Sequence, residues 1–352
     1  MEFNESTEAE FQDENRWIGF DSTDNSNYGY GSDYYFNSYA HFGIHEEMIK
    51  DTVRTDTYRK AIVRNPYLFQ DKIVLDIGCG TGILSVFAVR AGAKHVYAVD
   101  CSDIIDYAQK IIKNNGLQDK ITLIKGKIEE IQLPVYKVDI IISEWMGYFL
   151  LYESMLNSII FARDKWLING GLLFPDRARI IIAAIEDEKF KQNKFDFWRD
   201  VYGINMIAMR SRAIREPFVD LVEESKIIST QAPILDIDLH TVTIENLSFC
   251  SSYSLHIPKS QILSGIVGWF EVGFFHSHKP ITLNTSPRFK DTHWKQTIFY
   301  LNEGQQVEAG QVLHGSFAVR QNPAHNRELD IKVSFILEGS HRLRTWQFYR
   351  LT

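Results

Sequence analysis

Three stretches of the chain differ in how hydrophobic and polar residues alternate. Residues 1–30 hold eight acids against one base, with many Asn, Ser and Gly residues between them. A segment of this composition buries too little apolar surface to fold alone, so we predict a disordered acidic tail there. After Ser32 the apolar and aromatic residues recur at helical spacing, for example at Ile44 and Met48. Two short helices are therefore predicted, ending at Pro66.

Residues 73–175 alternate short apolar runs with helical patterns. The runs are rich in Val, Ile and Leu, as in strands whose two faces are both covered. Strands are predicted at 73–77, 95–99, 121–125, 138–142 and 172–174, with helices at 83–91, 104–114 and 155–167. This alternation predicts a parallel sheet with right-handed crossovers. We expect an α/β domain of Rossmann-like type over residues 31–175.

In the last half of the chain most segments have the two-residue period of strands. Strands are predicted at Ile180–Ile185, Thr241–Ile244, Tyr253–Ile257, Ile266–Phe275, Gln296–Leu301, Val312–Val319 and Leu329–Leu337. In the fourth of these, Val267 and Trp269 would face one side, while Phe270 and Val272 would face the other. An all-β domain over 176–352, a barrel or a sandwich, fits this pattern best.

Residues 187–220 interrupt the strand pattern. Phe190, Phe195, Trp198 and Tyr202 stand there among Lys, Asp and Arg residues, which indicates a helical excursion with an apolar face. Such a face would be exposed on a monomer, which favours an interface. The alternative is a helical hairpin packed on its own barrel.

The composition limits the class of partner and of compartment. A net charge of −7 and a pI of about 5.9 argue against a broad nucleic-acid surface and favour basic partners. Cys79, Cys101 and Cys250 stand at no metal-ligand spacing, so we expect a reducing compartment, no disulfide framework and no metal. No apolar run has the length of a membrane span, and the first residues lack a signal-peptide pattern. We therefore predict a soluble intracellular protein.

A glycine-rich turn closes the first predicted strand. The segment Val74–Gly82 reads V-L-D-I-G-C-G-T-G, and its glycines let the backbone approach a ligand closely. Asp100 ends the second strand, where a carboxylate can accept both ribose hydroxyls of a nucleotide. The spacing G-x-G-x-G resembles class I S-adenosylmethionine enzymes and differs from the dinucleotide pattern G-x-G-x-x-G. In that class Asp76 and Gly78 lie near the amino-acid end of the cofactor, and Glu129 would accept the adenine amino group.

Two glutamates bracket a nearly apolar segment after the fourth predicted strand. The segment Ser143–Glu153 reads S-E-W-M-G-Y-F-L-L-Y-E, with Glu144 and Glu153 near its ends. Two carboxylates between apolar and aromatic walls suit a planar cation, and a guanidinium can donate its N–H groups to them in bidentate geometry. We infer an enzyme that brings a cofactor to an arginine side chain.

Three other functions share parts of these patterns. A methyltransferase acting on a nucleic acid or a small molecule would have the same glycine turn, but the acidic charge argues against nucleic acid. A catalytically silent scaffold that binds S-adenosylmethionine would also keep the turn, although loss of either glutamate would then be expected. A nicotinamide dehydrogenase is disfavoured by the G-x-G-x-G spacing.

From about Ser32 to the C-terminus the chain resembles the type I protein arginine methyltransferases. The resemblance rests on Tyr34–Tyr39 (Y-Y-F-N-S-Y), Val74–Gly82, Ser143–Glu153 and Thr292–Gln296 (T-H-W-K-Q). It implies transfer of methyl groups from S-adenosyl-L-methionine to arginine side chains of proteins. It also implies a Rossmann-like cofactor domain, with N-terminal helices as a lid, followed by a β-barrel domain with a dimerisation arm.

The resemblance implies roles for individual residues. Glu144 and Glu153 would hold the substrate guanidinium, and His293 would pair with Asp51 to shape or deprotonate the site. Arg54 would grip the carboxylate of the cofactor. Other residues expected at the cofactor are Tyr35, Phe36, His45, Met48, Asp76, Gly78, Asp100, Cys101, Glu129 and Met155, and Tyr39 and Tyr148 would join the substrate site.

Single positions bear on the product and on cofactor affinity. Met48 and His293 match type I enzymes, whose products are monomethyl- and asymmetric dimethylarginine; relatives that make the symmetric product have Phe and Ser there. Asp100 stands where the family usually has Glu, so its reach to the ribose is one methylene shorter and cofactor affinity is expected to fall, unless the loop moves inward. Cys79 stands where a close relative has Ser, a small change.

The resemblance also implies partners and a location. Substrates would be Gly/Arg-rich segments of RNA-binding proteins and histone tails, steered by the negative net charge, with no direct contact to nucleic acid or membrane. The excursion at 187–220 would be an arm that docks on the cofactor domain of a second subunit, giving a ring-like homodimer. The expected location is the nucleus and the cytoplasm.

Overall fold

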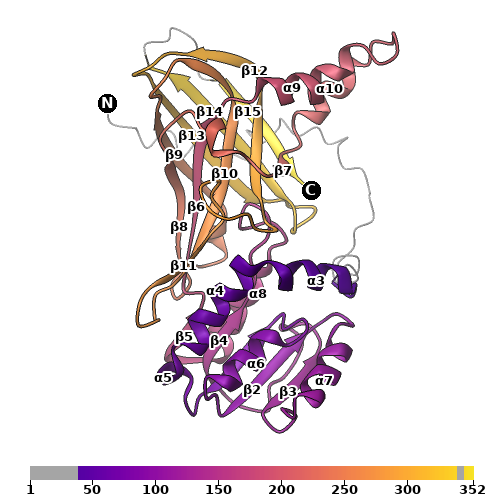
Figure 1. Cartoon of the computed structure of the whole chain (residues 1–352), viewed down its shortest axis with the longest axis vertical. Coiled ribbons are helices and arrows are strands. Elements are labelled where there is room, and N and C mark those ends of the chain that lie inside the picture. The colour runs from indigo at the N-terminus through magenta and orange to yellow at the C-terminus, as the bar shows by residue number, and fades with distance from the viewer. Residues whose placement is uncertain (1–38, 339–344) are drawn as a thin grey trace.

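The computed structural model describes residues 39–338 and 345–352 (Figure 1). A parallel sheet flanked by helices forms one end of the molecule, and long antiparallel strands form the other. The predicted acidic tail at 1–30, together with Tyr35 and Phe36, lies outside the described residues. The α/β part followed by an all-β part confirms the predicted fold class.

Within the described residues, three helices precede the parallel sheet: α3 (Phe42–Lys50), α4 (Thr52–Val63) and α5 (Pro66–Phe69). Two of them match the prediction, and Asp51 begins the second because its carboxylate accepts the N–H of Arg54. The prediction that Pro66 ends the block is wrong. Proline fits the first turn of a helix, where its missing N–H has no intrahelical partner anyway, and here it opens α5.

The parallel sheet has the strand order β3-β2-β1-β4-β5. Its strands are β1 (Ile73–Ile77), β2 (His95–Asp100), β3 (Ile121–Lys125), β4 (Val138–Ser143) and β5 (Leu167–Phe174), and its helices are α6 (Ile83–Arg90), α7 (Ile105–Asn114) and α8 (Met155–Trp166). All eight elements were predicted from the sequence, although β5 begins five residues earlier than expected. The order reverses between β1 and β4, and a ligand cleft is expected at the carboxyl ends of these two strands.

Two antiparallel sheets follow. One has the order β7-β12-β10-β6-β8 with β11 paired to β10, and the other has the order β15-β14-β13-β9. The strands are β6 (Arg177–Ile185), β7 (Phe218–Asp220), β8 (Ala232–Asp238), β9 (Phe249–His256), β10 (Gln261–Phe274), β11 (Ile281–Asn284), β12 (Gln296–Val307), β13 (Val312–Gln321), β14 (Leu329–Leu337) and β15 (Thr345–Leu351). The barrel that these sheets form lies next to the parallel sheet (Figure 1).

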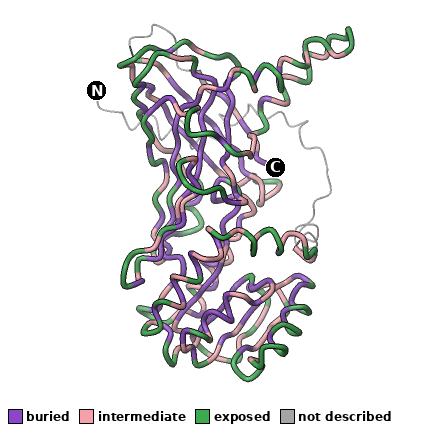
Figure 2. Tube along the Cα trace, viewed as in Figure 1, coloured by how far each residue is buried: buried purple, intermediate pink, exposed green. Residues whose placement is uncertain are grey.

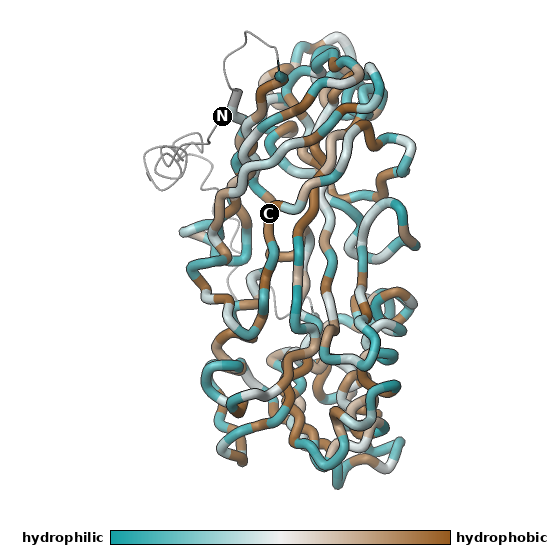
Figure 3. Tube along the Cα trace, turned by 90° about the vertical axis from the view of Figure 1, so that its left-hand side faces the viewer, coloured by the Kyte–Doolittle hydropathy of each residue, from teal (hydrophilic) through white to brown (hydrophobic). Residues whose placement is uncertain are grey.

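Strand β10 is buried on both of its faces, as its alternation predicts. Phe270 and Val272 belong to the main hydrophobic core, whereas Val267 and Trp269 belong to a second cluster. The main core is continuous between the two halves of the molecule. Figure 2 shows the buried residues running through the barrel into the parallel sheet, and Figure 3 shows the hydrophobic positions along the same strands.

One predicted strand is wrong and four strands were missed. Thr241–Ile244 forms turns that lead into the short 3-10 helix η5 (Glu245–Leu247). The strand in this part of the chain is β8, which pairs only with β6 and contains Pro233. Proline within a strand is tolerated at a sheet edge, because no neighbour there needs its N–H. The other missed strands, β7, β11 and β15, also lie at sheet edges, where burial imposes less of a pattern.

The excursion at 187–220 is helical, as predicted, and extends away from the barrel (Figure 1). It contains α9 (Glu188–Phe195), the 3-10 helix η3 (Asp196–Arg199) and α10 (Ile207–Ala213), and its chain returns as β7. At its outer end Phe197, Tyr202 and Ile204 are 50%, 100% and 56% exposed. The arm therefore carries an uncovered apolar end rather than packing entirely on its own barrel. Among the described residues, no helix is long and apolar enough to cross a membrane.

Candidate active site

A cavity of about 320 Å³ lies at the carboxyl end of the parallel sheet. Its wall is formed by the glycine turn, by α3 and α4, by the two-glutamate segment and by the barrel residues His293, Trp294 and Arg327. Most predicted site residues line this cavity: Tyr39, His45, Met48, Arg54, Gly78, Asp100, Cys101, Glu129, Glu144, Tyr148, Glu153, Met155 and His293. Asp51 and Asp76 stand behind the wall. Residues from both halves of the chain thus meet in one site.

The glycine turn has the backbone that the sequence pattern requires. Gly78, Gly80 and Gly82 have φ values of +68°, +53° and +82°, which side chains with a Cβ rarely adopt. A Cβ on Gly78 would lie 2.5 Å from the terminal methyl of Met155. Because Gly78 has no side chain, Met155 can lie against the turn, and both residues line the cavity with room for a ligand beside them.

Asp100 ties the end of β2 to the glycine turn. Its carboxylate accepts the N–H of Gly80 at 2.8 Å, and the N–H and hydroxyl of Ser102 at 2.8 and 2.7 Å. The Asp100 side chain, one methylene shorter than Glu, is thus held at the cavity wall by the glycine turn and by Ser102. On the same wall, Glu129 accepts the hydroxyl of Ser158 at 2.5 Å. Neither serine was singled out from the sequence.

Asp76 is fully buried under the turn and does not line the cavity. One of its oxygens accepts the Ser85 hydroxyl at 2.6 Å, and the other has no partner among the described residues. Burial raises the pKa of Asp76 to about 7, with the Ser85 hydrogen bond opposing the shift. Asp76 therefore supports the turn from below rather than facing the cavity.

Two cysteines line the cavity, and the pKa of both thiols is raised. Burial raises the pKa of the Cys79 thiol well above its ordinary value, and burial followed by the charge of Asp100 raises the pKa of Cys101. The thiolate is the reactive form of cysteine, so a raised pKa lowers the share of thiolate in both groups.

Glu144 is paired with Arg54 inside the protein. Arg54 Nε donates to Glu144 Oε2 at 2.8 Å, and both side chains are less than a tenth exposed. Arg54 also donates from Nη1 to the carbonyl oxygen of Met48 at 3.3 Å. The family resemblance assigns Arg54 and Glu144 to two different ligands, and the structure shows in addition that the two side chains bond to each other. This buried pair joins a residue expected at the cofactor to a residue expected at the substrate guanidinium.

Glu153 lies across the cavity from this pair. Its Oε2 accepts the hydroxyl of Tyr39 at 2.8 Å, and the carbonyl oxygen of Tyr39 is 2.8 Å from His45 Nε2. The backbone around Glu153 is strongly bent. Left-handed φ values occur at Phe149, Leu150, Glu153 and Ser154. Such values in residues other than glycine persist only when the surroundings hold them, and they gather at functional sites.

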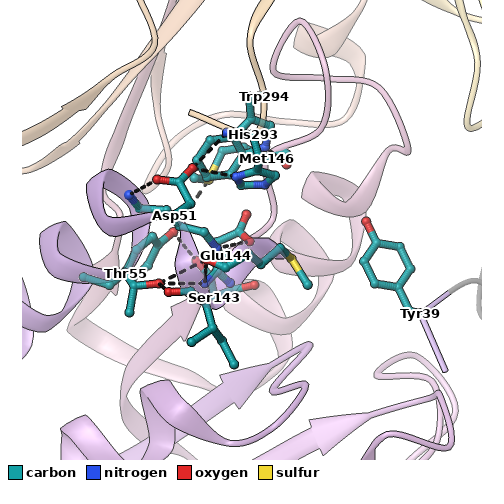
Figure 4. Close-up of polar contacts among 12 residues, drawn as sticks. Tyr39, Asp51, Thr55, Ser143, Glu144, Met146, His293 and Trp294 are labelled. Atoms are coloured by element: carbon teal, nitrogen blue, oxygen red, sulfur yellow. Dashed lines mark hydrogen bonds and ion pairs between the residues drawn. The ribbon is translucent and has the colours of Figure 1, made fainter. Parts of the chain in front are cut away.

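The barrel meets the helices before the parallel sheet where His293 pairs with Asp51, the residue that begins α4 (Figure 4). Asp51 Oδ2 accepts both His293 Nδ1 at 2.7 Å and the His293 main-chain N–H at 3.0 Å. The neighbouring Trp294 donates from Nε1 to the carbonyl oxygen of Met146 at 2.8 Å. The predicted pair therefore exists, and the same loop fastens the two-glutamate segment to the barrel.

Acid should weaken the fold through Asp51. Burial alone would raise the pKa of this carboxyl group, but hydrogen bonds from His293 and from the N–H of Arg54 hold it below its ordinary value of 3.8. The ionised carboxylate thus contributes stability that is present above that value and is lost as the pH falls further. We expect the free energy of unfolding to fall more steeply for wild type than for Asp51→Asn between about pH 5 and pH 3.

Denaturant titrations at a series of pH values measure this difference. The exposed Asp291→Asn serves as the control, and its curve should run parallel to that of wild type. Parallel curves for Asp51→Asn and wild type would contradict the expectation.

The fold and the cavity define a Rossmann-like, cofactor-dependent methyltransferase with a β-barrel attached. A family model described as ribosomal protein L11 methyltransferase matches residues 63–199, and one described as arginine methyltransferase oligomerization subdomain matches residues 176–340. The chain is 50% identical to protein arginine N-methyltransferase 1 of Chlamydomonas reinhardtii, over 91% of this chain and 93% of that protein. It is 53% identical to the protein of the same name from Schizosaccharomyces pombe, over 86% and 89% of the two chains.

Solved structures agree with these relatives. The chain superposes with a TM-score of 0.87 and 44% identity on the Trypanosoma brucei PRMT1 enzyme-prozyme complex with AdoHcy, covering 90% of this chain and all of that one. Protein arginine methyltransferase 10 of Arabidopsis thaliana gives a TM-score of 0.81 at 30% identity, covering 90% of this chain and 99% of that one. The chain belongs to the protein arginine N-methyltransferase family and is a type I, S-adenosylmethionine-dependent member.

Proposed function

We propose that this enzyme methylates arginine in Gly/Arg-rich and histone-tail segments, giving monomethyl- and asymmetric dimethylarginine. The observation that carries the proposal is the presence of Glu144 and Glu153 in one cavity with the glycine turn. Two carboxylates can accept the N–H groups of one guanidinium, and the aromatic segment between them limits water. The net charge of −7 favours basic segments as substrates.

The cavity residues suit S-adenosylmethionine. Asp100 and Glu129 offer acceptors for ribose hydroxyls and an adenine amino group, and Gly78 leaves space where a side chain would collide with Met155. The positively charged guanidinium of Arg54 can donate its N–H groups to a carboxylate of the ligand. When bound, the cofactor supplies the methyl group as part of a sulfonium.

The chemistry of the protein residues follows from the charge of arginine. A free guanidinium stays protonated, with a pKa above about 12, and is a poor nucleophile. The guanidinium would donate hydrogen bonds to Glu144 and Glu153, which hold its positive charge away from one nitrogen. That nitrogen would then form a bond to the methyl carbon, in line with the methyl–sulfur bond that breaks. Methyl transfer concentrates charge on the guanidinium, so fixed carboxylates stabilise the transition state more than the ground state. Glu153 and the His293–Asp51 pair are the two groups placed to accept the released proton.

Two residues support the asymmetric product. Met48 lines the cavity beside the Arg54–Glu144 pair, and His293 faces it from the barrel. Both match the type I pattern. The proposal includes the remaining assignments: Tyr35, Phe36 and Tyr39 in a lid, Tyr148 beside the substrate, and a cofactor domain over 31–175 followed by a barrel over 176–352.

A methyl-transfer assay tests the proposal. Wild-type enzyme is incubated with S-adenosylmethionine and a Gly/Arg-rich peptide, and the products are resolved by mass spectrometry with fragment ions that separate the two dimethyl isomers. We expect monomethylarginine first and asymmetric dimethylarginine later. A symmetric product would refute the product assignment. No transfer despite measurable cofactor binding would point to another acceptor or to a silent scaffold.

We also propose a homodimer in which the arm at 187–220 docks on the cofactor domain of a second subunit. The matched oligomerisation subdomain and the exposed apolar end of the arm support it. Replacing both Tyr202 and Ile204 by Asp should convert the dimer to a monomer at micromolar concentration, because charges would be buried in the interface. Sedimentation measures the change, and a wild-type monomer would contradict the proposal.

We place the enzyme in nucleus and cytoplasm, which localisation of the tagged chain tests.

A further inference from the structure

A loop of the barrel is fastened to the active-site segment. Residues 322–328 connect β13 and β14, and this loop contacts the chain at Glu153. The N–H of Glu153 donates to the carbonyl oxygen of Arg327 at 2.8 Å, and Arg327 Nη1 donates to the carbonyl oxygen of Glu153 at 2.7 Å. The hydroxyl of Ser154 donates to the carbonyl oxygen of Asn326. The barrel thus grips the backbone on both sides of the Glu153 α-carbon.

The grip falls where the backbone is strained. Glu153 and Ser154 have φ values of +73° and +58°. A left-handed conformation is unfavourable for a residue with a Cβ, so this bend needs support from outside the segment. Fixing both peptide groups of Glu153 sets the direction in which its side chain leaves the backbone. That direction brings its carboxylate to the Tyr39 hydroxyl at 2.8 Å.

The loop that provides the grip is itself held in one conformation. The side-chain oxygen of Asn322 accepts the N–H groups of Ala324 and His325 at 2.8 and 2.9 Å. Its amide nitrogen donates to Asp330 Oδ1 at 3.0 Å, and Asp330 is 1% exposed. Asn322 and Asp330 are buried whereas Pro323, Ala324 and Asn326 are exposed, so these hydrogen bonds fix the loop at its base. The loop can therefore act as a fixed reference for the active-site segment.

We propose that Arg327 is a positioning residue for Glu153, and that the 322–328 loop makes the barrel a part of the catalytic apparatus. The proposal rests on arginine methylation as the proposed function. Arg327 bonds to the main-chain carbonyl of Glu153, so it acts on the carboxylate through the backbone. Sequence patterns gave no signal for it, because Arg327 lies 174 positions from Glu153.

Arg327→Met removes the donor while keeping the length of the side chain. We expect kcat for peptide methylation to fall about 10- to 100-fold, because a shift of about 1 Å in a reacting group costs up to about 100-fold. The KM for S-adenosylmethionine should change by a smaller factor than kcat, because the glycine turn and Asp100 keep their hydrogen bonds although Arg327 itself lines the cavity. Arg327→Lys, which keeps a donor, should recover part of the loss. Arg179→Met is the matched control, because Arg179 pairs with Asp236 on the barrel away from the cavity.

A double substitution separates positioning from other roles. If Arg327 acts through Glu153, then Arg327→Met should cost less than about twofold in a Glu153→Gln background. An equal loss in both backgrounds would overturn the proposal, as would a kcat for Arg327→Met within twofold of wild type. Thermal unfolding establishes that each variant is folded. If Arg327→Met is not, Arg327→Lys and Ser154→Ala take its place in the same comparison.

Hydrogen exchange tests the proposal without any substrate. Amide exchange over residues 147–154 should be faster in Arg327→Met than in wild type and unchanged in Arg179→Met. This readout holds even if the chosen peptide is not methylated, so failure of the proposed function is distinguishable from failure of the positioning role. Unchanged exchange over this segment in Arg327→Met would overturn the role.

Discussion

Glu153→Gln should lower kcat for peptide methylation by about 100- to 1,000-fold, while cofactor binding stays within a few-fold of wild type. Glutamine keeps the shape of the side chain but loses the negative charge, and removing one preorganised group that stabilises developing charge costs about this much. The amide also presents N–H groups to a guanidinium, which has only donors of its own. Steady-state kinetics with a Gly/Arg-rich peptide, together with cofactor titration, measure both quantities.

The control for this substitution is Glu46→Gln on α3. Glu46 is exposed, pairs with Lys50 and does not line the cavity, so its kcat should stay near that of wild type. A Glu153→Gln enzyme that retains more than a tenth of the wild-type kcat would show that the carboxylate is not needed to hold the guanidinium.

Phe149→Ala should produce the largest loss of stability among single substitutions in the active-site segment. Phe149 is 2% exposed, and its ring lies 5.1 Å from that of Phe299 and 5.6 Å from that of Phe317. It also fills the space over Gly268, where a Cβ would come within 2.3 Å of the ring. Truncating a buried phenylalanine to alanine costs about 3–5 kcal/mol, because the cavity left behind only partly collapses. The new alanine would still have to keep a φ of +49°.

Denaturant unfolding and thermal unfolding of the full chain measure this loss. The exposed Phe289→Ala is the matched control, since its side chain is 59% exposed and its removal leaves no cavity. We expect a lower midpoint for Phe149→Ala alone, accompanied by loss of activity. Similar midpoints for the two variants would show that Phe149 does not join the segment to the barrel.

These predictions share a structural cause, because the active-site segment is attached to the barrel at several points. Phe149 packs among barrel strands, Trp294 bonds to the carbonyl of Met146, and Arg327 grips the backbone of Glu153. The parallel sheet supplies the cofactor wall of the cavity. The barrel supplies the restraints that place one of the two carboxylates.

The sequence determined the parts of this protein whose signals are local. Continuous apolar strands, the glycine turn and the two glutamates each depend on a few neighbouring residues, so the parallel sheet and the region of the site could be predicted. Edge strands were harder, because one unpaired side and partial burial leave a weaker pattern; Pro233 even pointed away from β8.

Only the tertiary structure decided how the site residues pair. Arg54 meets Glu144 across 90 positions, and His293 meets Asp51 across 242. The family resemblance assigns Arg54 and Glu144 to different ligands and does not include the direct bond that these two buried side chains form. Such pairings depend on where the barrel loops settle against the parallel sheet, and that position is set by packing over the whole core rather than by any short pattern. The residue types of the site can therefore be identified from the sequence, whereas the hydrogen bonds between them depend on the tertiary structure.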